Sequence, residues 1–343
     1  MTQLDTVFGP DSHYGWRPAD SRFLDILDEP FYRLLADLQD LVLVESSAFW
    51  KKRNAKFLNL PITTDTISSP MGRGSDSVPV SVDMFGVKTY LADSMQFMLE
   101  YGCRLNGAGA WYIMPSFRGE DADPTHLNQF FHSEAEIPGG LTDVMTLVDA
   151  YVRHLTGAAV NEFGSRIAEV AGGLGHVDAV IGADRYPRIT FDEAVSLLDD
   201  QPRFVRHEDG WRTLTRAGEQ ELLRTVHPVL WVSHYDHLSV PFYQAYAGDS
   251  TRTALNADLL FGIGEVVGCG ERHMNGEEAL RALEHHEVSP ASYDWYLRMK
   301  RARPMRTAGF GLGIERWLMW LLRSDDIREL QLVPRLNGIA LQP

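Results

Sequence analysis

Residues Ala308–Leu322 read AGFGLGIERWLMWLL, and two periodicities meet within them. Gly309, Gly311 and Gly313 alternate with apolar residues, so in a β-strand all three lie on one face and leave it without side chains. A flat or large ligand can lie directly on such a backbone. From Ile314 the apolar spacing becomes that of an amphipathic helix. The segment therefore predicts a glycine strand that continues directly into a helix.

Arg316 falls in the first turn of this predicted helix. The apolar face of the helix consists of Ile314, Trp317, Leu318, Leu321 and Leu322. A helix N-terminus together with a guanidinium group is suited to an anion. The spacing G-x-G-x-G is not the dinucleotide fingerprint, and the acidic residue that completes that fingerprint is missing. We infer a nucleotide on the glycine strand with a phosphate held by Arg316; the alternative is a packing strand followed by a solvent-exposed arginine.

The composition is that of an ordinary globular protein, with 44% hydrophobic and 23% charged residues in a chain of 343. No apolar run reaches the roughly 18–20 residues of a membrane span, and the N-terminus has no secretory pattern. Cys103 and Cys269 lie far apart and form no disulfide or metal framework. We therefore expect a cytoplasmic protein. The net charge of −15 argues against a broad basic surface for nucleic acid.

Helices and hairpin-like strands alternate irregularly along the chain. Apolar periodicity predicts helices over residues 31–56, 94–105, 144–172, 190–198, 276–287 and 314–322. Strands are predicted for VPVSVDMFG, VKTYLAD, WYIMPSFRGE, NQFFHSEAEI, VLWVSHY, PFYQAYA, LNADLLFG and GEVVGCGER. Regular crossover helices are missing, so we expect an α+β fold with a mixed antiparallel sheet flanked by helices, and no Rossmann fold. Residues 1–30 are expected to be irregular, and one domain to span 31–343.

A second group of functional residue types lies in Phe117–Ile137. Arg118 and Glu120 are two residues apart, which would put them on one strand face. Phe130, His132, Glu134 and Glu136 would likewise share one face of the next strand. An arginine, a carboxylate and an aromatic ring could hold a phosphate, an amino group and a base. The alternative is a solvated face with cross-strand ion pairs.

A third group lies in Asn256–His273. Asp258 and Glu265 flank a turn that contains two glycines, and Arg272 ends the second strand. Two carboxylates brought together in this way suit Mg²⁺, which prefers one or two carboxylates plus substrate phosphates. The alternative is a hairpin with surface charges.

In this order the three segments resemble the catalytic domain of class II aminoacyl-tRNA synthetases, specifically the aspartyl/asparaginyl branch. FRGE (117–120) resembles the second motif of that class, GFGLGIER (309–316) the third, and the long helix ending at Pro61 the first, dimer-forming motif. YLADSMQFMLE (90–100) resembles the amino-acid pocket of the branch, with matches at Ser94, Gln96 and Glu100. The resemblance covers about residues 31–335 and implies a class II catalytic domain, a homodimer, and ATP with Mg²⁺.

The resemblance also implies residue roles. Arg118 would hold the α-phosphate, Glu120 the adenine amino group and Arg316 the γ-phosphate, with Phe130 stacked on adenine. The implied ATP site comprises Arg118, Glu120, His126, Phe130, Gly311, Gly313 and Arg316. The implied substrate site comprises Ser94, Gln96, Glu134, Glu271 and Arg272, and Asp258 and Glu265 would hold Mg²⁺. Arg118, Arg316 and Glu265 would be the catalytic groups.

The sequence departs from the synthetase pattern at several points. Only about 30 residues precede the first motif, where the branch carries an anticodon-binding barrel. An Arg-His pair of the branch is replaced by Thr125-His126, and the loop SSPMGRGSDS (68–77) replaces an acidic glycine-rich stretch. Glu271 stands where a glutamine precedes Arg272, and Thr307 where a histidine is common.

These departures leave the ATP residues intact and alter the amino-acid and acceptor sides. They favour an amide ligase that resembles the asparagine synthetases related to asparaginyl-tRNA synthetase, with an aspartate-like acid, ammonia or a small amine, and no tRNA. Glu271 would bind or deprotonate the incoming ammonium, or instead form an ion pair with Arg272. Two alternatives stay open: an asparaginyl- or aspartyl-tRNA ligase without its own anticodon domain, and a non-catalytic paralogue that senses ATP or an amino acid.

Overall fold

The computed structural model describes residues 22–68 and 77–340. Its centre is an eight-stranded sheet in the order β1-β5-β6-β13-β12-β11-β10-β7. The neighbours from β5 to β10 are antiparallel, and the edge strands β1 and β7 pair in parallel. The strands, in sheet order, are Lys56–Phe57, Ala110–Phe117, Gln129–Pro138, Thr307–Gly313, Gly264–Glu271, Asn256–Phe261, Val229–Ser233 and Arg188–Thr190.

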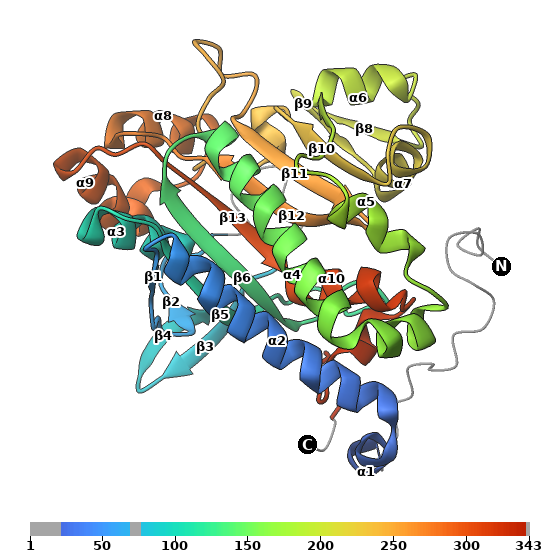
Figure 1. Cartoon of the computed structure of the whole chain (residues 1–343). Helices are drawn as coiled ribbons and strands as arrows, with labels where there is room; N and C mark the ends of the chain where they lie inside the picture. The colour runs from blue at the N-terminus through green and yellow to red at the C-terminus, as the bar shows by residue number, and fades with distance from the viewer. Residues whose placement is uncertain (1–21, 69–76, 341–343) are drawn as a thin grey trace.

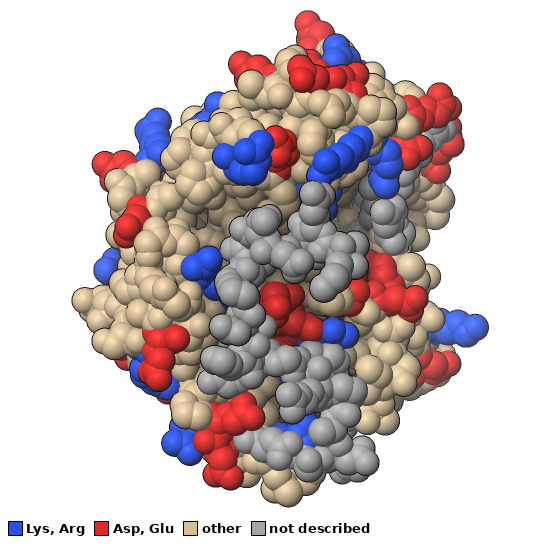
Figure 2. Space-filling model, turned by 90° about the vertical axis from the view of Figure 1, so that its right-hand side faces the viewer, with Lys and Arg blue, Asp and Glu red and all other residues tan. Residues whose placement is uncertain are grey.

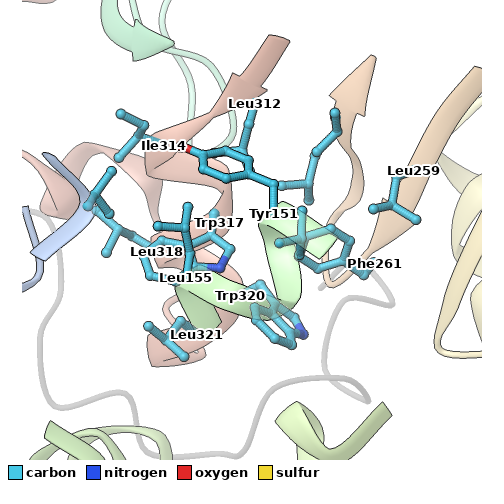
Figure 3. Close-up of a cluster of buried hydrophobic side chains, with 14 of the residues drawn as sticks. Tyr151, Leu155, Leu259, Phe261, Leu312, Ile314, Trp317, Leu318, Trp320 and Leu321 are labelled. Carbon is cyan, nitrogen blue, oxygen red and sulfur yellow. The ribbon is translucent and has the colours of Figure 1, made fainter. Parts of the chain in front are cut away.

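Two long helices, α2 (Pro30–Lys52) and α4 (Leu141–Ala171), lie side by side across one face of this sheet (Figure 1). The short helix α10 (Ile314–Leu322) packs against α4 and β6. Figure 3 shows the core between these layers, where Trp317 and Leu318 of α10 lie near Tyr151 and Leu155 of α4. The other face of the sheet is the one on which the glycines of β13 lie bare.

Smaller units surround the large sheet. One end carries the hairpin β8 (Val205–Glu208) and β9 (Trp211–Leu214) with α6 (Phe191–Leu197) and α7 (Arg216–Thr225). The other end carries α3 (Gln96–Asn106), α8 (Gly276–His285) and α9 (Asp294–Ala302). The remaining elements are β2 (Thr63–Thr64), β3 (Val80–Met84), β4 (Val87–Leu91), α1 (Arg22–Asp28), α5 (Asp178–Ile181) and four 3₁₀ turns, η1 (Gly175–Val177), η2 (His237–Ser239), η3 (Pro290–Tyr293) and η4 (Ile327–Leu330).

The predicted α+β class with a mixed antiparallel sheet is confirmed. The predicted helix over residues 314–322 matches α10 at both ends. The segment PFYQAYA (241–247) is not a strand; it forms only isolated bridges, Gln244 with Arg272 and Tyr246 with Ala254. The segment pairs with its neighbours at these two positions only, so a run of β-formers was misleading.

Three further differences concern bounds and faces. β5 ends at Phe117, so Arg118 and Glu120 lie in the connection after the strand and not on a strand face. Residues 22–28 form α1, although an irregular segment was expected up to residue 30; residues 1–21 lie outside the described part. The apolar spacing of the predicted helix over residues 31–56 included Val44, but in α2 Val44 is 53% exposed, because the apolar stripe that faces the core runs through Leu38, Leu41 and Val42.

The surface agrees with the acidic composition. On the face shown in Figure 2, basic side chains of the described residues stand singly or in small groups among acidic ones, without a continuous basic surface. Within residues 22–68 and 77–340, no helix is both long enough and apolar enough to cross a membrane.

Candidate active site

The glycine strand β13 lies in the middle of the sheet, between β6 and β12. Gly309 pairs with Glu136 of β6, and Gly311 pairs with Glu134. A Cβ at Gly309 would collide with the carboxylate of Glu136, and one at Gly311 would stand 3.0 Å from Oε1 of Glu134. The predicted bare face is therefore used in two ways. Its Gly309 end is occupied by carboxylates of the neighbouring strand, and its Gly313 end stays open beside Arg316.

At the open end, a cleft of about 720 Å³, counted to its mouth, collects residues of the second and third sequence groups. All seven of the implied ATP residues line it: Arg118, Glu120, His126, Phe130, Gly311, Gly313 and Arg316. Burial, followed by the charges of Arg118 and Arg316, lowers the pKa of His132 in this cleft to about 3. The guanidinium groups of Arg118 and Arg316 therefore both contribute positive potential inside this cleft.

Polar atoms in this cleft lack partners among the described residues. Nε of Arg118 and Oε2 of Glu120 are buried without a hydrogen bond there. The guanidinium of Arg118 also lies 5.4 Å from the ring centre of Phe130. Buried polar atoms are normally paired, so an unpaired donor and an unpaired acceptor indicate a ligand that pairs with both.

Arg316 is held at the start of α10 by β12. Its Nη1 donates to the carbonyl of Glu265 at 2.8 Å and lies 3.6 Å from the Glu265 carboxylate. The side chain is 26% exposed. The carbonyl bond orients the guanidinium while part of it still faces the cleft.

Three carboxylates meet beside Arg316. Asp258 and Glu265 come from paired strands, as predicted, and Glu219 of α7 joins them: its Oε2 accepts a hydrogen bond from the Glu265 amide at 3.3 Å. Burial and the charges of Glu265 and Glu219 raise the pKa of Asp258. Burial and Glu265 raise the pKa of Glu219 to about 7. A cation at this place would offset the repulsion between the three carboxylates. Carboxylate oxygens are also the ligands that Mg²⁺ prefers. Sequence reasoning missed Glu219, because α7 is brought to the hairpin only by tertiary contact.

The other end of the site is built around Arg272, which is 3% exposed. Its Nε and Nη2 donate to the carboxylate of Glu136 at 3.2 Å, and its Nη1 donates to Oε1 of Gln244 at 3.0 Å. Burial raises the pKa of Glu136, and Arg272 acts in the opposite direction. The guanidinium also lies 5.3 Å from the ring centre of Tyr243. Gln244 and Tyr243 were not singled out from the sequence, because their segment read as an ordinary strand.

Between the two ends lies Glu134. Ser94 donates to its Oε2 at 2.6 Å, and the hydroxyl of Tyr112 donates to the same oxygen. Burial raises the pKa of Glu134 to about 7, although these hydrogen bonds favour the ionised form. Ser94 and Glu134 therefore do meet. Gln96, at the start of α3, lies near the hydroxyl of Tyr243 and so reaches the Arg272 end.

Glu100, the third match to the amino-acid pocket, lies behind this site. It is fully buried, and its carboxylate accepts hydrogen bonds from Lys300 at 2.6 Å and from Tyr296 at 2.5 Å. Lys300 in turn donates to the carbonyl of His273 at 2.6 Å. This network joins α3 and α9 beneath the pocket and supports it.

The family assignment follows from comparison with known proteins. A model of the family described as tRNA synthetases class II (D, K and N) matches residues 18–337. The chain belongs to this family. Asparagine–tRNA ligases are among its similar curated proteins. The one from Thermococcus gammatolerans is 29% identical over 256 residues, which is 73% of this chain and 58% of the relative. The one from Sorangium cellulosum is 28% identical over 302 residues, 84% of this chain and 66% of the relative.

Solved structures of synthetases support the same family assignment. An asparaginyl-tRNA synthetase from Pyrococcus horikoshii, complexed with asparaginyl-adenylate, matches with a TM-score of 0.85 and 25% identity, over 94% of this chain and 73% of that one. An asparaginyl-tRNA synthetase from Entamoeba histolytica shares the fold, with a TM-score of 0.82 and 22% identity, over 94% of this chain and 71% of that one. This class II chain spans about 58% of the length of the Thermococcus relative. The named relatives are tRNA ligases, so the comparisons favour the tRNA-ligase hypothesis over the amide-ligase hypothesis.

The replacement of the Arg-His pair by Thr125-His126 is accompanied by an arginine from another part of this class II chain. His126 and Thr125 form a small cluster with Asp123, whose Oδ1 accepts from the Thr125 hydroxyl at 2.7 Å and lies 3.0 Å from Nδ1 of His126. Nη1 of Arg216, at the start of α7, donates to the Thr125 hydroxyl at 2.7 Å. Arg216 also lines a pocket with His126 and Arg316. A guanidinium from elsewhere in the chain thus stands beside the position where the branch has an arginine.

The expected roles of Glu271 are wrong in this class II fold. Successive strand residues point to opposite faces, so Glu271 and Arg272 point away from each other. Oxygens of Glu271 accept from Arg306 at 2.6 and 2.9 Å and from the amide of Leu141, at the start of α4, at 3.0 Å. Glu271 is therefore engaged on the helix side of the sheet. It forms no ion pair with Arg272 and does not face the substrate site.

Proposed function

We propose that this chain activates the carboxylate of an asparagine-like amino acid with Mg-ATP. A carboxylate oxygen attacks the α-phosphorus, the bond to the β-phosphate oxygen breaks, and an aminoacyl-adenylate and pyrophosphate result. The observation that carries the proposal is a cleft with unmet polar atoms at Arg118 and Glu120. It lies at one end of the glycine strand, whose other end pairs with the backbone of Glu136 and Arg272. Such a reaction needs positioning and charge stabilisation more than a protein nucleophile.

The nucleotide fits the cleft at the Gly313 end of the glycine strand. Arg118 offers an unmet donor for a phosphate, and Glu120 an unmet acceptor for an exocyclic amino group. Phe130 offers a ring for base stacking, and Arg316 a second guanidinium for the phosphate tail. Donors fixed by the fold stabilise the charge that develops on the α-phosphate oxygens without reorganising. Asp258, Glu265 and Glu219 would hold Mg²⁺, which would neutralise the phosphate charge.

The other end of the site favours a neutral side chain. Arg272 offers donors and Glu136 offers an acceptor within one buried pair. A carboxamide matches both, since its oxygen accepts and its amino group donates. A second carboxylate, as in aspartate, would meet the charge of Glu136 in a buried site, which is costly. This chemistry agrees with the asparaginyl-adenylate named in the Pyrococcus structure.

We propose that tRNA is the acceptor of the activated amino acid. The named relatives are tRNA ligases. Two of the five sequence departures that favoured ammonia have lost their support, because Glu271 is engaged on the opposite face and Arg216 stands beside Thr125. We further propose a homodimer through α2, on which Leu43 and Val44 are 50% and 53% exposed.

The test has three arms. Purified protein is incubated with Mg-ATP and either asparagine or aspartate, and pyrophosphate exchange is measured; exchange with asparagine alone is expected. Transfer is then followed as charged tRNA, or as asparagine formed from aspartate and ammonium. Amide formation without tRNA would establish the amide ligase instead. ATP binding without exchange for either amino acid would establish the non-catalytic alternative.

A further inference from the structure

Three histidines gather at the α8 end of the molecule, outside the site described above. They are His237 of η2, His285 at the end of α8, and His286, which follows α8 directly. One ring nitrogen from each lies within 4.8 Å of the others. His237 is 0% and His286 2% exposed. Segments about fifty residues apart in sequence thus bring three imidazoles to one point.

A backbone hydrogen bond sets the tautomer of His237. Its Nε2 lies 2.7 Å from the carbonyl oxygen of Gln244, and a carbonyl can only accept, so Nε2 carries the proton. Nδ1 is then the unprotonated nitrogen, and it points at Nε2 of His286, 2.8 Å away. A histidine that binds a metal through one nitrogen typically donates its other N–H to a carbonyl or carboxylate. His237 already has that arrangement.

The spacing suits a tetrahedral ion. Metal–nitrogen bonds of about 2.0–2.1 Å put two ligands of one tetrahedral ion about 3.3 Å apart. The His237–His286 pair is slightly closer than this, and the widest pair is at most 4.8 Å. Small rotations of the imidazoles about their side-chain bonds span both differences. The group contains no carboxylate, and imidazole nitrogen suits zinc and its transition-metal neighbours, whereas Mg²⁺ and Ca²⁺ prefer oxygen.

We propose that His237, His285 and His286 bind a divalent transition-metal ion, zinc foremost, with a fourth position open to water. Tyr246 covers the group: its ring centre lies 4.0 Å from that of His237, and its hydroxyl lies 3.1 Å from Nδ1 of His285. The ion would tie η2 to the end of α8 by bonds much stronger than the hydrogen bond present between their imidazoles.

The ion would also fix one wall of the amino-acid site. His237 holds the carbonyl of Gln244, and the side chain of the same Gln244 accepts from Arg272. The metal site is therefore one residue removed from the groups that we assign to the substrate side chain. Metal binding itself does not rest on the proposed function, so the two can fail separately.

The experiment uses untagged full-length protein, because an affinity tag of histidines would bind metal. Its zinc content is measured by mass spectrometry after dialysis, and chelator-treated protein is titrated with Co²⁺ and followed by visible absorption. We expect about one Zn²⁺ per chain and the intense absorption of tetrahedral Co²⁺. An octahedral carboxylate site, as at Asp258, gives only weak absorption and so is distinguished.

Substitutions at the cluster complete the test. His285→Asn, at the less buried of the three imidazoles, should weaken metal binding at least about 10-fold and abolish the zinc-dependent rise in melting temperature. His207→Asn, at an exposed histidine paired with Asp200, is the matched control and should behave as wild type. Protein without stoichiometric zinc and without tetrahedral cobalt absorption would overturn the proposal. So would His285→Asn with unchanged affinity, since the three imidazoles would then be only a buried hydrogen-bonded group.

Discussion

The two ends of the glycine strand carry arginines in opposite situations. Arg118, at the open end, has a buried Nε without a partner among the described residues. Arg272, at the closed end, is bound by Glu136 and Gln244 and is almost fully buried. The first is prepared to bind a charge that arrives with the ligand. The second has its charge compensated in advance, so that it can select a neutral polar group. Substitution of Arg118 should therefore affect function alone, whereas substitution of Arg272 should affect both function and stability.

The largest effect is expected at the closed end. Arg272→Met leaves the buried Glu136 without its partner and should lower the free energy of unfolding by about 3–5 kcal/mol. Adding Glu136→Leu should restore most of the stability but not adenylate formation, measured by denaturant unfolding and pyrophosphate exchange. Arg301→Ala, at an exposed pair with Glu277, is the control and should cost at most about 1 kcal/mol. If Arg272→Met and Arg301→Ala had the same free energy of unfolding, the proposed difference between the two ends would be refuted.

At the open end we expect loss of rate without loss of stability. Arg118→Ala removes a fixed donor from the developing phosphate charge and should lower kcat/KM for pyrophosphate exchange by about 10²–10³. Its melting temperature should stay near that of wild type, because no described residue depends on the Arg118 Nε for a hydrogen bond. A variant that unfolds as readily as Arg272→Met would show that both ends are structural.

The carboxylate group should make stability depend on pH. The pKa of Glu219 is raised from its usual 4.5 to about 7, so its contribution to stability is fully present below pH 4.5 and is lost as the pH rises to about 7. In Mg²⁺-free buffer, Glu219→Gln should therefore lose less stability than wild type over this interval. Glu221→Gln, on the same helix, is the control, since Arg224 lowers the pKa of Glu221. If the free energy of unfolding changed with pH by the same amount in Glu219→Gln and wild type, repulsion between Glu219 and the neighbouring carboxylates would be excluded.

The smallest effect concerns the arginine beside Thr125. Arg216→Ala should raise the KM for ATP by about 10-fold, as expected for one lost phosphate contact, and leave the melting temperature unchanged. Arg224→Ala, at the exposed end of the same helix, serves as the control. An unchanged KM would mean that Arg216 only orders the Thr125 loop.

The contrast between the two ends was only partly readable from the sequence. The elements were predictable where one local pattern applied over its whole length. The glycine alternation gave β13, and the switch to helical spacing at Ile314 gave α10. The placement of Asp258 and Glu265 on two paired strands followed from a hairpin around a glycine turn. These features depend on neighbours in the chain, so periodicity is sufficient to find them.

Positions set by long-range contact were not predictable in this way. Glu219 and Arg216 reach the site because α7 packs against β12, and Gln244 reaches Arg272 because the two residues form an isolated bridge. Glu271 was assigned to the substrate side because it adjoins Arg272 in sequence. Strand alternation directs it to α4 instead.

The sequence by itself thus determined the glycine strand, the helix α10 and the inventory of arginines and carboxylates, because each depends on a few neighbouring residues. The tertiary structure alone decided which of these groups meet. It paired Arg272 with Glu136 and left Arg118 open, and it joined His237 to His285 and His286. Burial and charge act through space, and their effect on a side chain depends on strands and helices that are distant along the chain.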